Sequence, residues 1–217
     1  MTAGYRDRAD AGRLLAVAVK GALAELPEVV LALPRGGVPV AAEVAGALGA
    51  DLDVLLVRKL GVPGHRELAM GAIASGGIRV VNADVVANAG IDPGEAEAVI
   101  REEQGELERR ARAYRGDRPP PDLAGRRVLL VDDGLATGAT MLAAVASARA
   151  AGARRVDVAV PVAPRSALDR LAGPADAVVC PLIPDRFYAV GSWYGDFGQV
   201  PDGIIRQALG VEDAHEH

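Results

Sequence analysis

The chain has 217 residues, half of them apolar, which is enough for one sizeable buried core. Its formal net charge of −5 argues against a nucleic-acid partner, because nucleic-acid-binding proteins usually carry a basic surplus. The single cysteine excludes an intrachain disulfide, and the lack of an apolar leader or of an apolar run of about 18 residues predicts a cytoplasmic protein without a membrane partner.

The first part of the chain alternates between helical and strand-like patterns. Apolar residues at helical spacing predict a helix over residues 6–26. Short apolar runs predict buried strands at Val29–Leu33 and Asp53–Lys59, with a helix at Val38–Gly49 between them. The Gly- and Pro-rich residues 60–69 predict an exposed loop.

The rest of the chain continues the alternation. A hairpin is expected around Ser75–Gly77, and Asp92, as the N-cap of a Pro-Gly-Glu start, predicts a helix to about Tyr114. A strand–helix–strand unit follows over residues 127–163, and one more strand is expected within 175–183. The chain therefore predicts an α/β fold with a mostly parallel twisted sheet flanked by helices, whose ligand site lies beyond the carboxyl ends of the strands.

The stretch VLLVDDGLATGAT, residues 128–140, joins a buried strand to a helix through two aspartates and a turn of small residues. Small residues let backbone N–H groups approach an anion, and a helix N-terminus favours negative charge. The turn lacks the Gly-Lys-Ser/Thr ending of a nucleoside-triphosphate loop. Asp132 and Asp133 can accept hydrogen bonds from hydroxyl groups, so a phosphate cradle beside them suits a 5-phosphorylated ribose. The structural alternative is a tight strand–helix connection without a ligand.

This stretch resembles the phosphoribosyl-pyrophosphate (PRPP) binding motif of the type I phosphoribosyltransferases, and the resemblance extends over about residues 28–200. It implies that a nucleobase nitrogen displaces pyrophosphate from C1 of PRPP through an oxocarbenium-like transition state. Asp132 and Asp133 would be catalytic and would bind Mg²⁺. The turn residues that would bind the substrate are Ala136, Thr137, Gly138, Ala139 and Thr140.

Two basic segments extend the resemblance. PRGG looks like the family's pyrophosphate loop, with Arg35, Gly36 and Gly37 as substrate-binding residues and a cis peptide bond expected before Arg35 or Gly36. Arg58 and Lys59 resemble the second basic site and would be catalytic. The polar residues 60–69, which include His65, resemble the mobile catalytic loop and would close as a lid. An ordinary turn and two surface charges are the alternatives for these segments.

The segment IPDRFYAVGSWYGDF, residues 183–197, resembles the hood of hypoxanthine-guanine phosphoribosyltransferases. Phe187 would stack on the base, with Tyr188 and Trp193 as alternatives. Asp196 would hold a second Mg²⁺ through water. Ala136 departs from the 6-oxopurine enzymes, which have an aspartate there, and LATG is closer to the adenine enzymes. A purine-like acceptor is therefore favoured, without a particular base.

The expected organisation is a single structural domain, with a PRPP-binding core over residues 1–180 and a hood segment with an acidic tail over 181–217. The expected assembly is a homodimer. The favoured function is phosphoribosyl transfer from PRPP to a nucleobase-like small molecule. The alternative is a PRPP-sensing regulatory protein with little or no catalysis, and the intact acids and basic segments favour the enzyme.

Overall fold

The structure is a computed structural model that describes residues 4–62, 65–81 and 83–211, with the side chains of 65–69, 83, 84 and 87 also outside the described part. Its centre is a five-stranded sheet of order β2-β1-β6-β7-β8, and every neighbouring pair is parallel. The strands are β1 (Val29–Ala32), β2 (Asp51–Val54), β6 (Arg127–Val131), β7 (Arg155–Ala159) and β8 (Ala177–Val179). The predicted fold class, a mostly parallel sheet flanked by helices, is confirmed.

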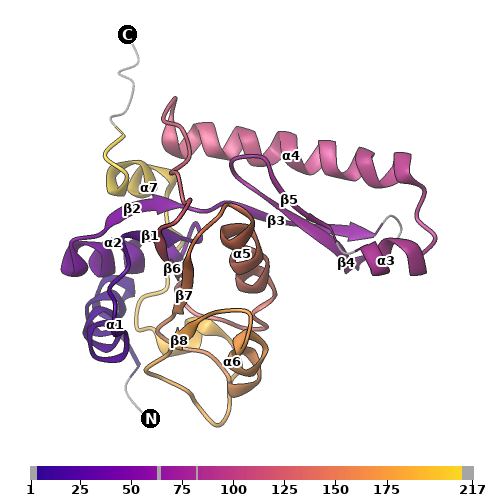
Figure 1. The fold of residues 1–217 in the computed structure, drawn as a ribbon. Coiled ribbons are helices and arrows are strands. Elements are labelled where there is room, and N and C mark those ends of the chain that lie inside the picture. The colour runs from indigo at the N-terminus through magenta and orange to yellow at the C-terminus, as the bar shows by residue number, and fades with distance from the viewer. Residues whose placement is uncertain (1–3, 63–64, 82, 212–217) are drawn as a thin grey trace.

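Helices cover both faces of this sheet, as Figure 1 shows. The helices of the two layers are α1 (Arg8–Ala22) and α2 (Gly37–Leu48) on one face, and α5 (Ala139–Ala150) and α6 (Arg165–Leu171) on the other. Alternate residues of β1 supply the two cores: Val30 packs with the α1–α2 layer, and Leu31 packs with the α5–α6 layer. Burial on both faces explains why these strands are continuous apolar runs rather than alternating ones.

The chain leaves the central sheet after β2 and forms an arm, residues 57–115, that extends to one side in Figure 1. The arm contains an antiparallel sheet of order β3-β4-β5 and the long helix α4 lying along it. Its elements are β3 (Val57–Val62), β4 (His65–Ala74), β5 (Ile78–Val81), α3 (Ala83–Asn88) and α4 (Pro93–Arg115). The predicted hairpin around Ser75–Gly77 is confirmed. So is the N-cap at Asp92, whose side chain accepts hydrogen bonds from the N–H groups of Gly94 and Glu95.

Two predictions for this region are wrong. The run Asp53–Lys59 is not one strand: β2 ends at Val54, opposite Ala32, the last residue of β1. The chain then enters β3, so Arg58 and Lys59 lie in the antiparallel sheet. The expected loop over 60–69 is largely strand, since described residues on both sides of 63–64 belong to β3 and β4.

The remaining part of the chain closes the molecule beside the carboxyl edge of the central sheet, which is where β1 and β6 end. Residues 183–200 contain a short 3₁₀ turn, η1 (Val190–Trp193), and are followed by α7 (Asp202–Ala208), whose Ile205 is buried in the α1–α2 core. Residues near the N-terminus pair with this segment: Tyr5 donates its N–H to the Trp193 carbonyl, and Gly195 donates to the Tyr5 carbonyl. No helix in the described ranges is long and apolar enough to cross a membrane.

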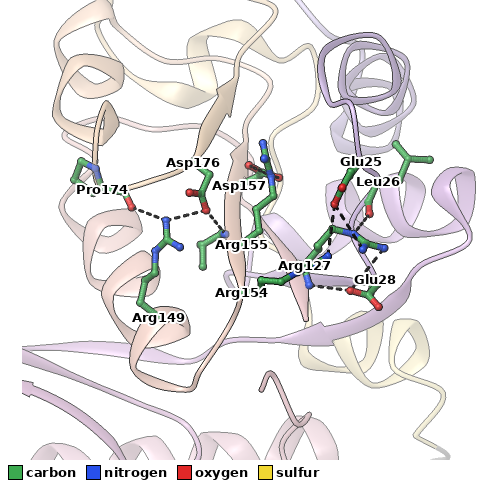
Figure 2. Close-up of polar contacts among 11 residues, drawn as sticks. Glu25, Leu26, Glu28, Arg127, Arg149, Arg154, Arg155, Asp157, Pro174 and Asp176 are labelled. Atoms are coloured by element: carbon green, nitrogen blue, oxygen red, sulfur yellow. Dashed lines mark hydrogen bonds and ion pairs between the residues drawn. The ribbon is translucent and has the colours of Figure 1, made fainter. Parts of the chain in front are cut away.

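The opposite, amino edge of the sheet carries a network of arginines and acids. Figure 2 shows Arg149 reaching Asp176 (2.8 Å) and Arg155 beside Asp157 (2.8 Å). The other ion pairs of this edge are Arg126–Asp51, Arg127–Glu25, Arg127–Glu28 and Arg154–Glu25. Five arginines therefore face five acids, and the charges at the start of the strands balance one another.

Candidate functional site

The two predicted substrate loops meet at the carboxyl edge of the sheet. PRGG follows β1, and the acid-containing turn follows β6, which is the immediate neighbour of β1. Gly36 lies so close to the second acid that a Cβ placed on it would stand 1.9 Å from Asp133 Oδ2. A Cβ on Gly37 would stand 2.7 Å from the Val131 carbonyl oxygen. Glycine is therefore required here for space, and the Pro34–Arg35 peptide bond is cis, as predicted.

The two acids share a crowded, partly desolvated position. The Asp133 N–H donates to Asp132 Oδ1 at 2.8 Å, and the Asp133 side chain is buried. Burial, together with the charge of Asp133, raises the pKa of Asp132 well above its ordinary value. Burial also raises the pKa of Asp133, although a hydrogen bond from Arg8 opposes that rise. A pair of carboxyls with perturbed pKa values in a loop cluster is typical of a functional site.

Arg8, at the start of α1, is a site residue that the sequence did not reveal. Its Nε donates to Asp133 Oδ2 at 2.8 Å, and both side chains are largely buried, with exposed fractions of 11% and 13%. Its Nη1 donates to the Gly198 carbonyl, and its guanidinium lies 3.9 Å from the centroid of the Phe197 ring. Arg8 thus links the acids to the segment that covers them. It carries no motif, because YRDRAD reads as an ordinary charged helix start.

The small-residue turn has the geometry that an anion cradle needs. Gly138 precedes α5 with a φ of 76°, the left-handed region that favours glycine, and Ala139 begins the helix. The Ala139 N–H points back to the Thr137 hydroxyl at 3.4 Å. Thr137 and Thr140 are exposed, as is Ala136. The helix N-terminus therefore presents backbone donors and two hydroxyl groups to solvent at the carboxyl edge.

A small cavity brings the three predicted loops together. It has a volume of about 50 Å³, and its wall contains Pro34 from the first loop, Arg58 from β3 and Thr140 from α5, with Arg110 of α4 beside them. Arg58 pairs with Glu103 of α4. Lys59 is exposed and is absent from the wall of this cavity, as expected for alternate residues of a strand that point to opposite faces. Its catalytic role stays a prediction.

Arg35 and the covering segment complete the surroundings. Arg35 is exposed and lies 3.4 Å from Asp202 of α7. Tyr194, which sequence reasoning also passed over, donates its hydroxyl to the Asp133 carbonyl oxygen at 2.5 Å. Phe187 packs partly against the cluster around Tyr5 and Tyr194, whereas the rival Tyr188 is 83% exposed. The stacking role of Phe187 stays a prediction.

The two acids are ligands of the type that a magnesium ion prefers. Asp132 and Asp133 offer hard carboxylate oxygens, and burial raises the pKa of both, so a bound cation would favour their charged forms. Asp196 is exposed and accepts a hydrogen bond from the Gly198 N–H. Within the described part of the chain, no three acidic, histidine or cysteine side chains form a common ligand group. Mg²⁺ commonly binds through one or two carboxylates with phosphate oxygens, and Asp132 and Asp133 could supply the carboxylates.

Comparisons with known proteins agree with this geometry. A sequence model of the family described as "Phosphoribosyl transferase domain" matches residues 7–191. Two Mycobacterium tuberculosis proteins provisionally named phosphoribosyl transferases, MT0597 (strain CDC 1551 / Oshkosh) and Rv0571c (strain ATCC 25618 / H37Rv), are each 52% identical over 201 residues. That match covers 93% of this chain and 45% of each relative, so the chain spans a little under half the length of the curated relatives.

The solved structure of TT1426 from Thermus thermophilus is similar over nearly its whole length. It is 47% identical, and the superposition covers 95% of this chain and 97% of that chain with a TM-score of 0.87. The similarity therefore includes the arm as well as the central sheet. With the family match running from Asp7 through the acid pair to Gly191, this chain belongs to the phosphoribosyl transferase domain family.

Proposed function

We propose that the protein transfers the 5-phosphoribosyl group of PRPP to a purine-like nucleobase and releases pyrophosphate. The observation that supports this most strongly is the direct contact between the PRGG loop and the acid pair, with Gly36 packed on Asp133. The loop suited to a diphosphate and the acids suited to a ribose therefore adjoin, as the directly bonded ribose and diphosphate of one PRPP molecule require.

In the proposed reaction, the turn over 136–140 binds the 5-phosphate through backbone N–H groups and threonine hydroxyls. Asp132 and Asp133 accept hydrogen bonds from the ribose hydroxyls and stabilise positive charge as it develops on the sugar. Arg35, with the backbone of Gly36 and Gly37, binds the diphosphate, and Arg58 adds positive charge on its other side. As the C1–oxygen bond breaks, the bonding electrons leave with pyrophosphate, while the base nitrogen forms the new bond to C1 and its proton is lost to solvent.

Mg²⁺ is the proposed cofactor, held by Asp132 and Asp133 together with oxygens of the substrate. When bound, it would neutralise the charge of the leaving diphosphate. Asp196 is proposed as a contact to a second Mg²⁺ through water. Without these cations, the acids would face the diphosphate with an unfavourable charge.

The base is proposed to lie under the segment 183–197, with Phe187 stacked on it. The proposed setting is the cytoplasm, and the proposed assembly is a homodimer. A PRPP-sensing regulator is the second candidate, because the same geometry would bind PRPP without turnover. The enzyme is favoured because both acids and both basic segments that the reaction needs, Arg35 and Arg58-Lys59, are present in the chain.

The test is release of pyrophosphate from PRPP and Mg²⁺ against a panel of nucleobases, with PRPP binding measured in parallel by calorimetry. Turnover with a purine base is the expected result. Binding of PRPP without turnover on any base would favour the sensor. Failure to bind PRPP in the presence of Mg²⁺ would contradict both candidates.

A further inference from the structure

The helix α4 places a cation at the site that none of the three substrate loops contains. Arg110 lines the cavity of about 50 Å³ together with Arg58, Thr140 and Pro34. That volume has room for a few water molecules, and therefore for one tetrahedral anion. Two guanidinium groups and a hydroxyl on one cavity wall are donors without a matching acid among the lining residues.

The ion pairs of Arg110 leave its guanidinium group available to bind a further anion. Its Nε lies 2.7 Å from Glu106, one turn earlier on α4. Glu106 is already bound by Arg109, whose Nε and Nη2 donate to its two oxygens at 2.8 and 3.0 Å. The two arginines lower the pKa of Glu106 to about 2, so it stays ionised. Because Arg109 satisfies both oxygens of Glu106, Arg110 can turn to another anion without leaving that carboxylate unpaired.

The same face of α4 also carries the acid that pairs with Arg58. Glu103, Leu107 and Arg110 follow one another at spacings of four and three residues, so they lie on one side of α4. Leu107 is buried and lines the cavity, and Glu103 pairs with Arg58. Arg58 and Arg110 line the cavity, whereas their partners Glu103 and Glu106 are absent from its wall, so the wall itself carries two positive charges and no negative one.

We propose that Arg110 is a further substrate-binding residue, which together with Arg58 and Thr140 binds a phosphate group of the substrate in this cavity. The inference rests on the proposed function. The cavity lies between Pro34 of the loop suited to the diphosphate and Thr140 of the turn suited to the 5-phosphate, so both ends of PRPP supply the same chemistry. The arm thus contributes directly to substrate binding.

The experiment compares Arg110→Gln with Arg112→Gln in the full chain. Arg112 lies two residues further along α4, is 78% exposed and is absent from the wall of this cavity, so its variant removes the same charge without touching the site. Calorimetry at fixed ionic strength measures binding of Mg²⁺–pyrophosphate in one arm and of ribose 5-phosphate in the other. Arg110→Lys, which keeps the charge but not the planar fork, serves as the second variant, and thermal melting checks folding of all three.

We expect Arg110→Gln to lower the affinity for one of the two ligands about tenfold and Arg110→Lys to lower it less. The affinities of Arg112→Gln should stay within about twofold of those of the wild type. The ligand that loses affinity identifies which end of PRPP the cavity binds. Equal affinities in the wild type and Arg110→Gln, or equal losses in Arg110→Gln and Arg112→Gln, would overturn the inference while leaving the proposed function standing. A wild type that binds neither ligand would overturn both.

Discussion

The two edges of the central sheet carry similar residues in different electrostatic states. At the amino edge, five arginines face five acids, and most of these side chains are at least one-third exposed, as in the Arg149–Asp176 pair at 35% and 34%. At the carboxyl edge, Asp132 and Asp133 lie together and have raised pKa values, with Arg8 as their cationic neighbour. Balanced, exposed charges contribute little to stability and suggest a structural role, whereas crowded, partly buried charges of one sign indicate a binding site.

The largest effect that would test this contrast is removal of a carboxylate from each edge. We expect Asp132→Asn or Asp133→Asn to lower turnover by at least about 10²-fold, because each keeps the shape but removes charge that stabilises the transition state. Asp176→Asn removes the same charge from the amino edge and should keep wild-type turnover, with a stability loss of up to about 1 kcal/mol. Turnover and urea unfolding would be measured on all three. Unchanged turnover in both carboxyl-edge variants would remove the distinction between the edges.

A second test concerns packing at the carboxyl edge. Gly36→Ala should lower turnover by about 10²-fold, since the new Cβ would stand 1.9 Å from Asp133 Oδ2 and must displace the loop or the acid. Gly46→Ala on α2 is the matched control: a Cβ there meets nothing within 4 Å, so turnover should hold and stability should rise slightly. Steady-state kinetics and thermal melting distinguish the two. Full activity in Gly36→Ala would show that loop and acid need not touch.

Arg8 offers a smaller and more specific test. Arg8→Ala removes a hydrogen bond to a buried carboxylate and should lower kcat/KM about tenfold, whereas Arg8→Lys, which keeps the charge, should recover part of that loss. Arg149→Ala removes an arginine from the amino edge and should leave both kcat and KM unchanged. A fall in kcat at an unchanged KM would indicate that Arg8 positions Asp133. A general loss of fold would change both quantities. Identical kinetics in Arg8→Ala and the wild type would show that the Arg8–Asp133 ion pair has only a structural role.

The smallest expected effect is on stability, and its sign follows from the raised pKa of Asp132. The unfolded chain releases this proton near the ordinary value of 3.8, and the folded chain holds it to higher pH because burial and Asp133 disfavour the charge. Between those two pKa values the folded state binds more protons, so the free energy of unfolding falls as pH rises. Asp132→Asn should remove the free-energy cost of ionising this carboxyl group in the folded protein. It should therefore stabilise the chelator-treated protein at neutral pH, with no gain below the ordinary pKa of 3.8.

Urea unfolding of the wild type and Asp132→Asn across this pH range would measure the difference. A variant that is less stable than the wild type at neutral pH would mean that the carboxylate is favourably bound in the folded protein. The acid pair would then resemble the amino edge rather than contrast with it.

The central sheet and the acid turn were predictable because their signals are local. Buried parallel strands read as continuous apolar runs, and the strand, acids and small turn of residues 128–140 are contiguous. The break between Val54 and Val57 was not predictable, since both halves of Asp53–Lys59 are suitable strand residues and the break depends on where β1 stops. Arg8 and Arg110 were hidden for a related reason: each sits in a charged helical stretch, and its importance arises from residues far away in the chain.

The Arg8–Asp133 contact has a consequence for how the protein is made. It joins residues 125 positions apart, and Tyr194 reaches back 61 positions to the same aspartate. At a synthesis rate of about 5–20 residues per second, several seconds pass between the appearance of Asp133 and that of Tyr194. During that interval the nascent chain can build the strands on which the acids lie, but not the closure around them. A growing polypeptide therefore exposes its acid pair to solvent and to cellular cations before the finished molecule covers it.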